Sequence, residues 1–234
     1  IGDDKIITSL RKTLLQLKAL QREQGQIASN YYPQGKVSYG SLTPRIDGVT
    51  WYVIGVCLAI KSGILTPGPW KKSISNCFTA LDTIEYNGRG LVYIPTGGNW
   101  ADEYPYFGYI LYDQVLRLWA LKLAGQIFTN SSWTEKATAL EESIHVNYFP
   151  DVDHREHPAV YHKTLYSKAS QNPPSHYYCS FSPTGYQKQF DLAAHALLML
   201  VANPNHKMRI PLSSAISWIA REMLGNGKLP PAFH

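Results

Sequence analysis

Charged residues are scarce in this chain of 234 residues, since Asp, Glu, Lys and Arg together make up only 17% of it. The 22 Lys and Arg residues outnumber the 17 Asp and Glu residues, which leaves a formal charge of +5. A small, scattered excess does not indicate a nucleic-acid-binding surface, because such a surface needs clustered basic residues. We therefore expect no nucleic-acid partner.

Long apolar runs are also missing. The longest apolar stretch, Trp51 to Ile60, is too short to cross a bilayer, and no signal-peptide pattern opens the chain. We expect a soluble protein without a membrane partner, in the cytoplasm rather than secreted. The chain starts at Ile1 rather than at Met, so a signal peptide removed earlier stays an open alternative.

Cysteine is rare as well, with only three residues, Cys57, Cys77 and Cys179. Their number is odd and their spacing is wide, so they form neither a CxxC metal pair nor a complete disulfide framework. Because Cys57 and Cys77 lie in apolar runs, we predict that both are small core residues.

Aromatic residues, in contrast, reach 12% of the chain, with 16 Tyr and 6 Trp. Rings with polar edges suit a cleft in which sugars or bases stack. The hydrophobic fraction of 44% is ordinary for a globular chain, and the length suits one substantial domain.

Apolar residues recur at helical spacing along most of the chain. The expected helices run from Asp3 or Asp4 to Gly25, Val49 to Ile60, Pro69 to Ile84, Tyr106 to Phe128, Ser132 to Val146, Asp191 to Val201 and Pro211 to Leu224. Ser132 and Glu135 form a predicted capping box. The stretch Leu91 to Ile94 predicts a short strand, and Asn147 to Gln189 predicts a long functional or mobile loop.

Helix, loop and helix alternate at intervals of roughly fifty residues, with apolar helices and aromatic, polar loops. This rhythm is typical of stacked helical hairpins, either in an open solenoid or in a closed α/α barrel, whose loops at one end bind ligands. Seven helices do not close a barrel of six hairpins. We therefore expect an all-α fold of antiparallel helical hairpins, an (α/α)6 barrel that is incomplete in this chain.

The densest polar and aromatic cluster is the loop Gly97 to Tyr104. Asp102 lies between Trp100 and Tyr104, whose apolar walls would raise its pKa and whose rings would stack on a sugar. The general acid of a glycosidase needs such a raised pKa and a sugar held beside it. Asp102 or Glu103 fits the N-cap of the following helix equally well.

A second cluster comprises residues 36–41 and 45–51. Asp47 takes the expected N-cap position of an apolar helix, and Arg45 can pair with Asp47 or with substrate hydroxyls. Capping alone explains this local sequence more simply than substrate binding.

Several motifs resemble bacterial six-hairpin glycosidases of the amylo-α-1,6-glucosidase and debranching-enzyme-like group. In the first part of the chain they are Leu20-Gln21, Gly25-Gln26-Ile27, Ser29-Asn30, Val37-Ser38-Tyr39-Gly40 and Arg45-Ile46-Asp47. Asn99-Trp100-Ala101-Asp102, followed by Gly108-Tyr109, Leu111-Tyr112 and Leu116, is similar to the loop and helix that hold the general acid. Alkaline and neutral invertases show a comparable order, and Phe190-Asp191-Leu192 resembles the next inner helix.

The resemblance implies a glycoside hydrolase that acts on an α-glucoside or related oligosaccharide with inversion and without a cofactor. Asp102 matches the general acid. The residues that the resemblance implies at the sugar site are Tyr39, Arg45, Asp47, Trp51, Asn99, Trp100 and Tyr104.

The catalytic base of this group is a Glu near the last hairpins, and nothing before His234 matches it. Residues 1–234 are therefore expected to be part of one α/α-barrel catalytic domain, a fragment that lacks the last hairpins, or a domain that has lost hydrolysis. The alternatives are a carbohydrate-binding or degenerate domain and an α-helical scaffold for protein partners. The oligomeric state stays open.

Two further sequence patterns contain residues found in metal sites or phosphate-binding loops. The segment Asp151 to His157 mixes metal-ligand types, but its spacing matches neither an EF-hand nor an HExxH site. We interpret it as a solvated loop and expect no metal site. Gly97-Gly98 lacks the Lys and the Ser or Thr of a phosphate-binding loop.

Overall fold

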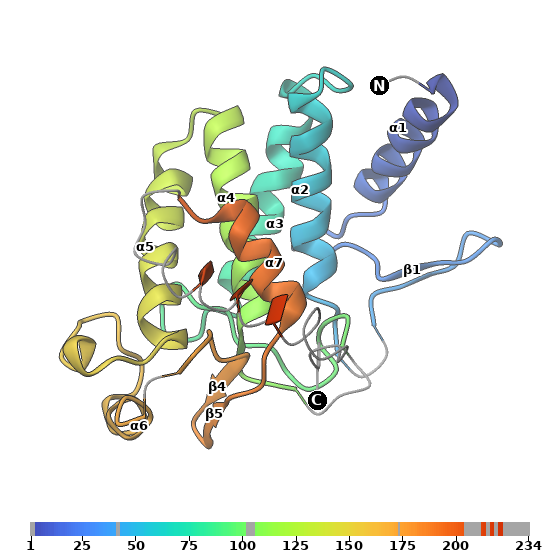
Figure 1. The fold of residues 1–234 in the computed structure, drawn as a ribbon. Coiled ribbons are helices and arrows are strands. Elements are labelled where there is room, and N and C mark those ends of the chain that lie inside the picture. The colour runs from blue at the N-terminus through green and yellow to red at the C-terminus, as the bar shows by residue number, and fades with distance from the viewer. Residues whose placement is uncertain are drawn as a thin grey trace.

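The computed structural model describes residues 3–40, 43–101, 106–172 and 174–203, together with six residues between 212 and 221. This part of the chain is mostly helical, with seven α-helices, two 3-10 turns and five short strands (Figure 1). Within the described ranges, no helix is both long enough and apolar enough to span a bilayer.

Side-chain caps mark several helix starts. Asp3, Asn130 and Asp191 accept hydrogen bonds from the backbone N–H groups of Lys5, Trp133 and Ala194. Such caps satisfy amides that have no partner inside the helix. The helices are α1 (Asp4–Ala19), α2 (Asp47–Lys61), α3 (Lys71–Asp82), α4 (Leu111–Ile127), α5 (Ser131–Tyr148), α6 (Lys163–Ala169) and α7 (Leu192–Val201), with 3-10 turns η1 (Gly68–Trp70) and η2 (Val152–His154).

The strands form two small antiparallel sheets at the periphery of the helices. One is the hairpin of β1 (Asn30–Tyr31) and β2 (Val37–Ser38). The other has the order β3-β4-β5, from β3 (Tyr109–Ile110), β4 (Ser180–Ser182) and β5 (Gly185–Gln187). Tyr109 pairs with Phe181, so this sheet joins the 180s segment to the start of α4.

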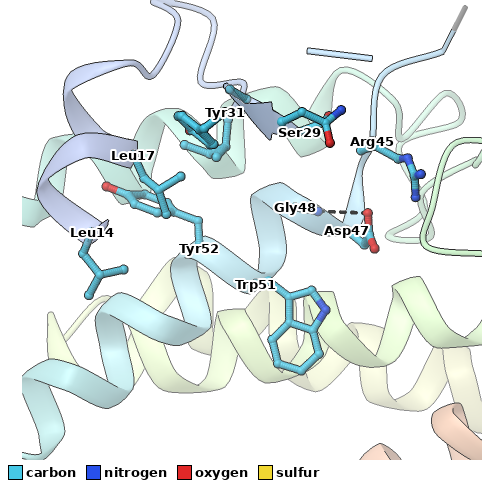
Figure 2. Close-up of a pocket in the computed structure, with 12 residues that line it drawn as sticks. Leu14, Leu17, Ser29, Tyr31, Arg45, Asp47, Gly48, Trp51 and Tyr52 are labelled. Carbon is cyan, nitrogen blue, oxygen red and sulfur yellow. Dashed lines mark hydrogen bonds between the residues drawn. The ribbon is translucent and has the colours of Figure 1, made fainter. Parts of the chain in front are cut away.

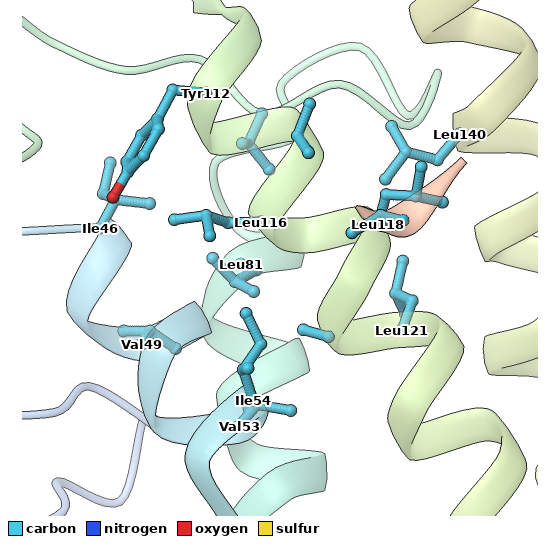
Figure 3. Close-up of a cluster of buried hydrophobic side chains, with 14 of the residues drawn as sticks. Ile46, Val49, Val53, Ile54, Leu81, Tyr112, Leu116, Leu118, Leu121 and Leu140 are labelled. Atoms are coloured by element: carbon cyan, nitrogen blue, oxygen red, sulfur yellow. The ribbon is translucent and has the colours of Figure 1, made fainter. Parts of the chain in front are cut away.

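Helix α4 is the central element, because α2, α5 and α7 all pack against it. Of its 17 residues, 13 are buried, as expected for a helix that is apolar on nearly every side. Figure 3 shows Leu116 of α4 near Leu81 of α3, with Val53 of α2 further along the same core, while Leu118 lies toward Leu140 of α5.

The helices alternate in direction along the chain. In Figure 1, α2, α4 and α7 start at the lower end of the bundle and run upward, whereas α1, α3 and α5 run downward. The packed pairs α2 with α3 and α4 with α5 are therefore antiparallel hairpins, and the loops before α2, α4 and α7 lie at one end. The mostly helical class predicted from the sequence is confirmed.

The predicted strand Leu91–Ile94 is wrong. Among these residues only Ile94 forms a bridge, with Gly108. The backbone of Val92 pairs instead with the side chain of Gln114, which donates from Nε2 to the Val92 carbonyl and accepts at Oε1 from the Val92 amide, each at 2.9 Å. A side chain of α4 thus takes the place of a partner strand.

Two other local predictions need correction. Asn130, not Ser132, caps α5, so the proposed capping box lies two residues too late. The expected loop 147–189 contains η2, α6, β4 and β5. Most of the predicted helix 211–224 lies outside the described residues.

The cysteines behave as the sequence predicts. Cys57 and Cys77 are fully buried in the core, and with Cys179 they are free thiols. Burial raises the pKa of Cys57 and of Cys179 to about 12, so both thiols stay protonated at neutral pH. They are packing residues rather than nucleophiles.

Candidate functional site

Three aspartates lie at the starts of α2, α4 and α7, which share one end of the bundle. Asp47 is the first residue of α2, Asp113 lies in the first turn of α4, and Asp191 is the N-cap of α7. Carboxylates at these positions interact favourably with the helix dipoles. We call these three residues the acidic cluster.

All three carboxyl groups are buried, with exposed fractions of 8% for Asp47, 2% for Asp113 and 1% for Asp191. Burial raises the pKa of each, that of Asp191 to about 7. The charges of Asp47 and Asp191 also raise the pKa of Asp113. The three groups therefore interact electrostatically, and protons are retained in the acidic cluster at pH values where ordinary carboxyls are ionised.

Nearby amide groups donate hydrogen bonds to the carboxyl oxygens of the acidic cluster. Gly48 N donates to Asp47 Oδ1 at 3.0 Å, Asn99 Nδ2 donates to Asp113 Oδ2 at 2.9 Å, and Ala194 N donates to Asp191 Oδ1 at 2.9 Å. Asp113 Oδ1 and Asp191 Oδ2 are buried without a hydrogen-bond partner in the described part of the chain. Unsatisfied buried carboxyl oxygens favour the protonated form or a bound donor.

Asn99 fixes the loop beside the acidic cluster. Besides its bond to Asp113, its Oδ1 accepts from Ala101 N at 3.0 Å, and its carbonyl accepts from Arg45 Nη1 at 2.6 Å. The Gly98 carbonyl accepts from Ile46 N at 2.8 Å. The two polar clusters recognised in the sequence therefore meet at the start of α2.

This arrangement corrects the predicted position of Asp47. Ile46 is the N-cap of α2, and it makes no side-chain cap bond. Asp47 is the next residue, and its carboxyl accepts hydrogen bonds from the backbone amides of Gly48 and Trp100. Asp47 thus joins the helix start to the loop 97–101 in addition to stabilising the first turn.

Aromatic rings border the acidic cluster. Trp51 Nε1 donates to Tyr112 Oη at 3.0 Å, and the ring centroids of Trp100 and Tyr112 lie 5.9 Å apart. Trp51 is 40% exposed and Trp100 is 43% exposed, so both offer ring surface to a ligand. Exposed rings beside buried polar groups are typical of a site that binds amphipathic molecules such as sugars.

A cavity of about 460 Å³ adjoins these residues, between α1, residues 27–31 and the first turns of α2. Figure 2 shows Arg45, Asp47 and Trp51 toward one end of it and Leu14, Leu17 and Tyr52 toward the other. We call it the α1–α2 cavity.

The structure brings Arg45, Asp47, Trp51, Asn99 and Trp100 together, and their role in binding sugar stays a prediction. Asp102 and Tyr104 lie outside the described residues.

Tyr39 lies apart from this group. It lines a second pocket, of about 260 Å³, which it shares with Arg45. Its hydroxyl donates to the Leu20 carbonyl at 2.5 Å, and the Arg22 guanidinium lies 3.8 Å from its ring centroid. These contacts give Tyr39 a structural role in holding the segment after α1.

Sequence reasoning did not single out Asp113 and Tyr112 as members of the site. The available signal was a polar residue in the first turn of an otherwise apolar helix, which by itself indicates only dipole stabilisation. Asp191 was recognised only as a helix start that resembles an inner barrel helix.

In the described ranges, no group of three His, Cys, Asp or Glu side chains is arranged to hold a metal ion. The segment Asp151 to His157 forms η2 and an exposed or half-exposed turn, as the solvated-loop interpretation predicts.

The sequence matches no protein-family model, and it matches no curated protein at a significant level.

The buried Asp191 predicts a distinctive pH dependence of stability. Its folded pKa of about 7 exceeds the unfolded value of about 3.9, so between these values the unfolded chain releases a proton that the folded chain retains. Stability contributed by the neutral form is complete below about pH 4 and is lost as the pH rises to about 7. Asp191→Asn keeps the oxygen that caps α7 but cannot ionise, so the variant does not lose this stability as the pH rises.

We expect the free energy of unfolding of Asp191→Asn, relative to wild type, to rise by about 1–3 kcal/mol between pH 4 and pH 7.5. Urea denaturation of both proteins at the two pH values measures it. Burial lowers the pKa of His195 to about 4, but both proteins contain His195, so its contribution largely cancels. Asp3→Asn, at the exposed cap of α1, is the matched control. A difference that does not change with pH contradicts the prediction.

Proposed function

We propose that this chain belongs to a glycoside hydrolase of the (α/α)6-barrel kind, which acts on α-glucosides or related oligosaccharides with inversion. The observation that carries the proposal is the meeting of the acidic cluster with Trp51 and Trp100 at one end of three parallel helices. Paired carboxyls and stacking rings are the groups that glycoside hydrolysis requires.

The helix arrangement supports this architecture. Helices α2, α4 and α7 pack in one row, with α3 packed against α2 and α5 against α4. In the proposed barrel, the row supplies inner helices and the other two supply outer helices. The inner helices all start at the end where the acidic cluster lies, which makes this end the ligand-binding face (Figure 1).

In the proposed reaction, Asp102 protonates the glycosidic oxygen as the leaving group departs. Asn99 and Ala101 hold the loop up to the residue before Asp102, and Ala101 is itself buried. Trp51 and Trp100 stack on sugar rings, while Asp47 and Arg45 hydrogen-bond hydroxyl groups. An inverting enzyme needs its base roughly 6.5–9.5 Å from the acid, and the family resemblance implies a Glu in this role.

Calorimetric titration with maltose and isomaltose tests the sugar site without requiring turnover. We expect Trp51→Ala to weaken binding about 3- to 10-fold, because an aromatic stacking contact contributes about 0.5–1.5 kcal/mol. Leu58→Ala is the matched control, since Leu58 lies further along α2 and is 39% exposed. Equal effects of the two substitutions would show that Trp51 does not contact the sugar. Absence of sugar binding by the wild type would refute the proposed function.

A further inference from the structure

The chain contains one acceptor motif for N-linked glycosylation. Asn130, Ser131 and Ser132 form the pattern Asn-X-Ser, in which X is not proline. No other asparagine in the sequence is followed by Ser or Thr two residues later. The pattern matters because the transferring enzyme recognises the acceptor asparagine together with the hydroxyl group two residues after it.

The structure places this motif at the surface, in the tight turn between α4 and α5. Asn130 N donates to the Gly125 carbonyl at 3.0 Å, and Asn130 is the N-cap of α5. Asn130 is half-buried, whereas Ser131 and Ser132 are exposed. The turn lies at the upper end of the bundle in Figure 1, and the acidic cluster lies at the lower end. A glycan on this turn therefore leaves the end with the acidic cluster uncovered.

The Asn130 side chain leaves free the atom to which a glycan is attached. Its Oδ1 accepts a hydrogen bond from Trp133 N at 3.1 Å and thereby caps α5. Its Nδ2 is not buried, and it makes no hydrogen bond to the described part of the chain. Glycosylation changes Nδ2 and keeps Oδ1. The folded structure therefore accommodates a sugar on Asn130 without losing the helix cap.

An open cavity of about 420 Å³ offers room for the first sugar unit. Asn130 lines this cavity together with Trp133, Lys71 and Lys72. Trp133 is half-buried, and its ring centroid lies 6.1 Å from that of Phe128. A partly accessible ring can stack on the apolar face of a sugar, while ammonium groups donate hydrogen bonds to its hydroxyl and acetamido oxygens.

We propose that Asn130 is an N-glycosylation site. In the transfer, Asn130 Nδ2 forms a bond to C1 of the first N-acetylhexosamine of a lipid-diphosphate-linked oligosaccharide. The bond from C1 to the diphosphate oxygen breaks, the lipid diphosphate leaves, and Nδ2 gives up one proton to the transferase. The modification places the protein in the secretory pathway, in contrast to the cytoplasmic location expected from the sequence. It does not depend on the proposed function.

Mass spectrometry of the full-length protein, isolated from the cells that naturally produce it, tests this site. We expect the peptide that contains Asn130 to carry a glycan. Treatment with peptide-N-glycosidase in heavy-oxygen water is expected to release the glycan and to convert the modified asparagine into labelled aspartate. An unmodified Asn130 in this protein overturns the proposal.

Two variants produced in the same cells test the motif. Ser132→Ala removes the hydroxyl group that the motif requires, so we expect loss of the glycan. Ser131→Ala changes the neighbouring exposed serine and is expected to keep it. Both variants retain Asn130 and its cap on α5, so a loss of the glycan in Ser132→Ala does not reflect a damaged helix start. A glycan that persists on Asn130 in Ser132→Ala, or that is lost equally in both variants, overturns the proposal.

Discussion

Asp102→Asn is expected to lower the turnover of an unactivated α-glucoside by at least about a hundredfold, the usual contribution of a general acid. Asparagine keeps the shape of aspartate but carries no proton to give to the leaving oxygen. Binding of sugar is expected to stay nearly unchanged, because Trp51 and Trp100 do not depend on that proton. The measurement is the turnover of both variants in the full-length protein, with affinity followed by calorimetry.

Two comparisons make the Asp102 prediction specific. An aryl glucoside with a good leaving group needs little protonation, so the variant is expected to recover much of its loss on this substrate. Glu103→Gln changes the neighbouring carboxyl and is expected to leave turnover close to wild type. Equal turnover of Asp102→Asn and wild type on the unactivated glucoside would contradict the assignment of Asp102 as the general acid, and Asp102 does not cap α4 either, because the N-cap of α4 is Ile110.

The substitution with the largest expected effect on stability is Arg117→Ala, at about 3–5 kcal/mol of unfolding free energy. The Arg117 side chain is 1% exposed, and its Nη2 lies 2.7 Å from Asp82 Oδ1 and 2.5 Å from Glu85 Oε2. Burial by itself raises the pKa of Glu85, but Arg117 and Lys136 together lower it below its ordinary value. Removing Arg117 leaves the buried Glu85 carboxylate paired with the more exposed Lys136.

Lys136→Ala is the matched control for Arg117. Lys136 Nζ contacts the same carboxylates at 2.6 and 3.1 Å, but its side chain is 30% exposed. We expect a loss of about 0–1 kcal/mol, as for other solvated ion pairs. Urea denaturation at neutral pH measures both losses. If Arg117→Ala does not fold, adding Glu85→Gln is expected to restore part of its stability, and equal losses for Arg117→Ala and Lys136→Ala contradict the account.

Local signals predicted most of the helices. Asp3 before an amphipathic run gave the start of α1, and the nearly continuous apolar pattern of α4 gave a buried central helix. The sheet β3-β4-β5 was missed because Tyr109 pairs with Phe181, far along the chain, and such pairing leaves no local periodicity. Helix α6, with only seven residues, is too short to show a helical repeat.

In the site, too, groups of residues close in sequence could be predicted, whereas contacts between distant residues could not. The clusters around Arg45 and Asn99 could be found from composition, and their expected placement at one end of the helices agrees with the bond between these two residues. Asp113 could not be assigned to the site, because its role depends on burial and on Asp47 and Asp191. The contact of the Tyr39 hydroxyl with the Leu20 carbonyl could not be predicted either, because these residues are 19 positions apart and no sequence pattern links them.

We propose that sugar binds at the starts of α2, α4 and α7. A crystal structure of the chain with the disaccharide that binds best tests it most directly. We expect a sugar ring against Trp51 and Trp100 with a hydroxyl group hydrogen-bonded to Asp47. A disaccharide bound only at the opposite end of the bundle, where α3 and α5 begin, contradicts it.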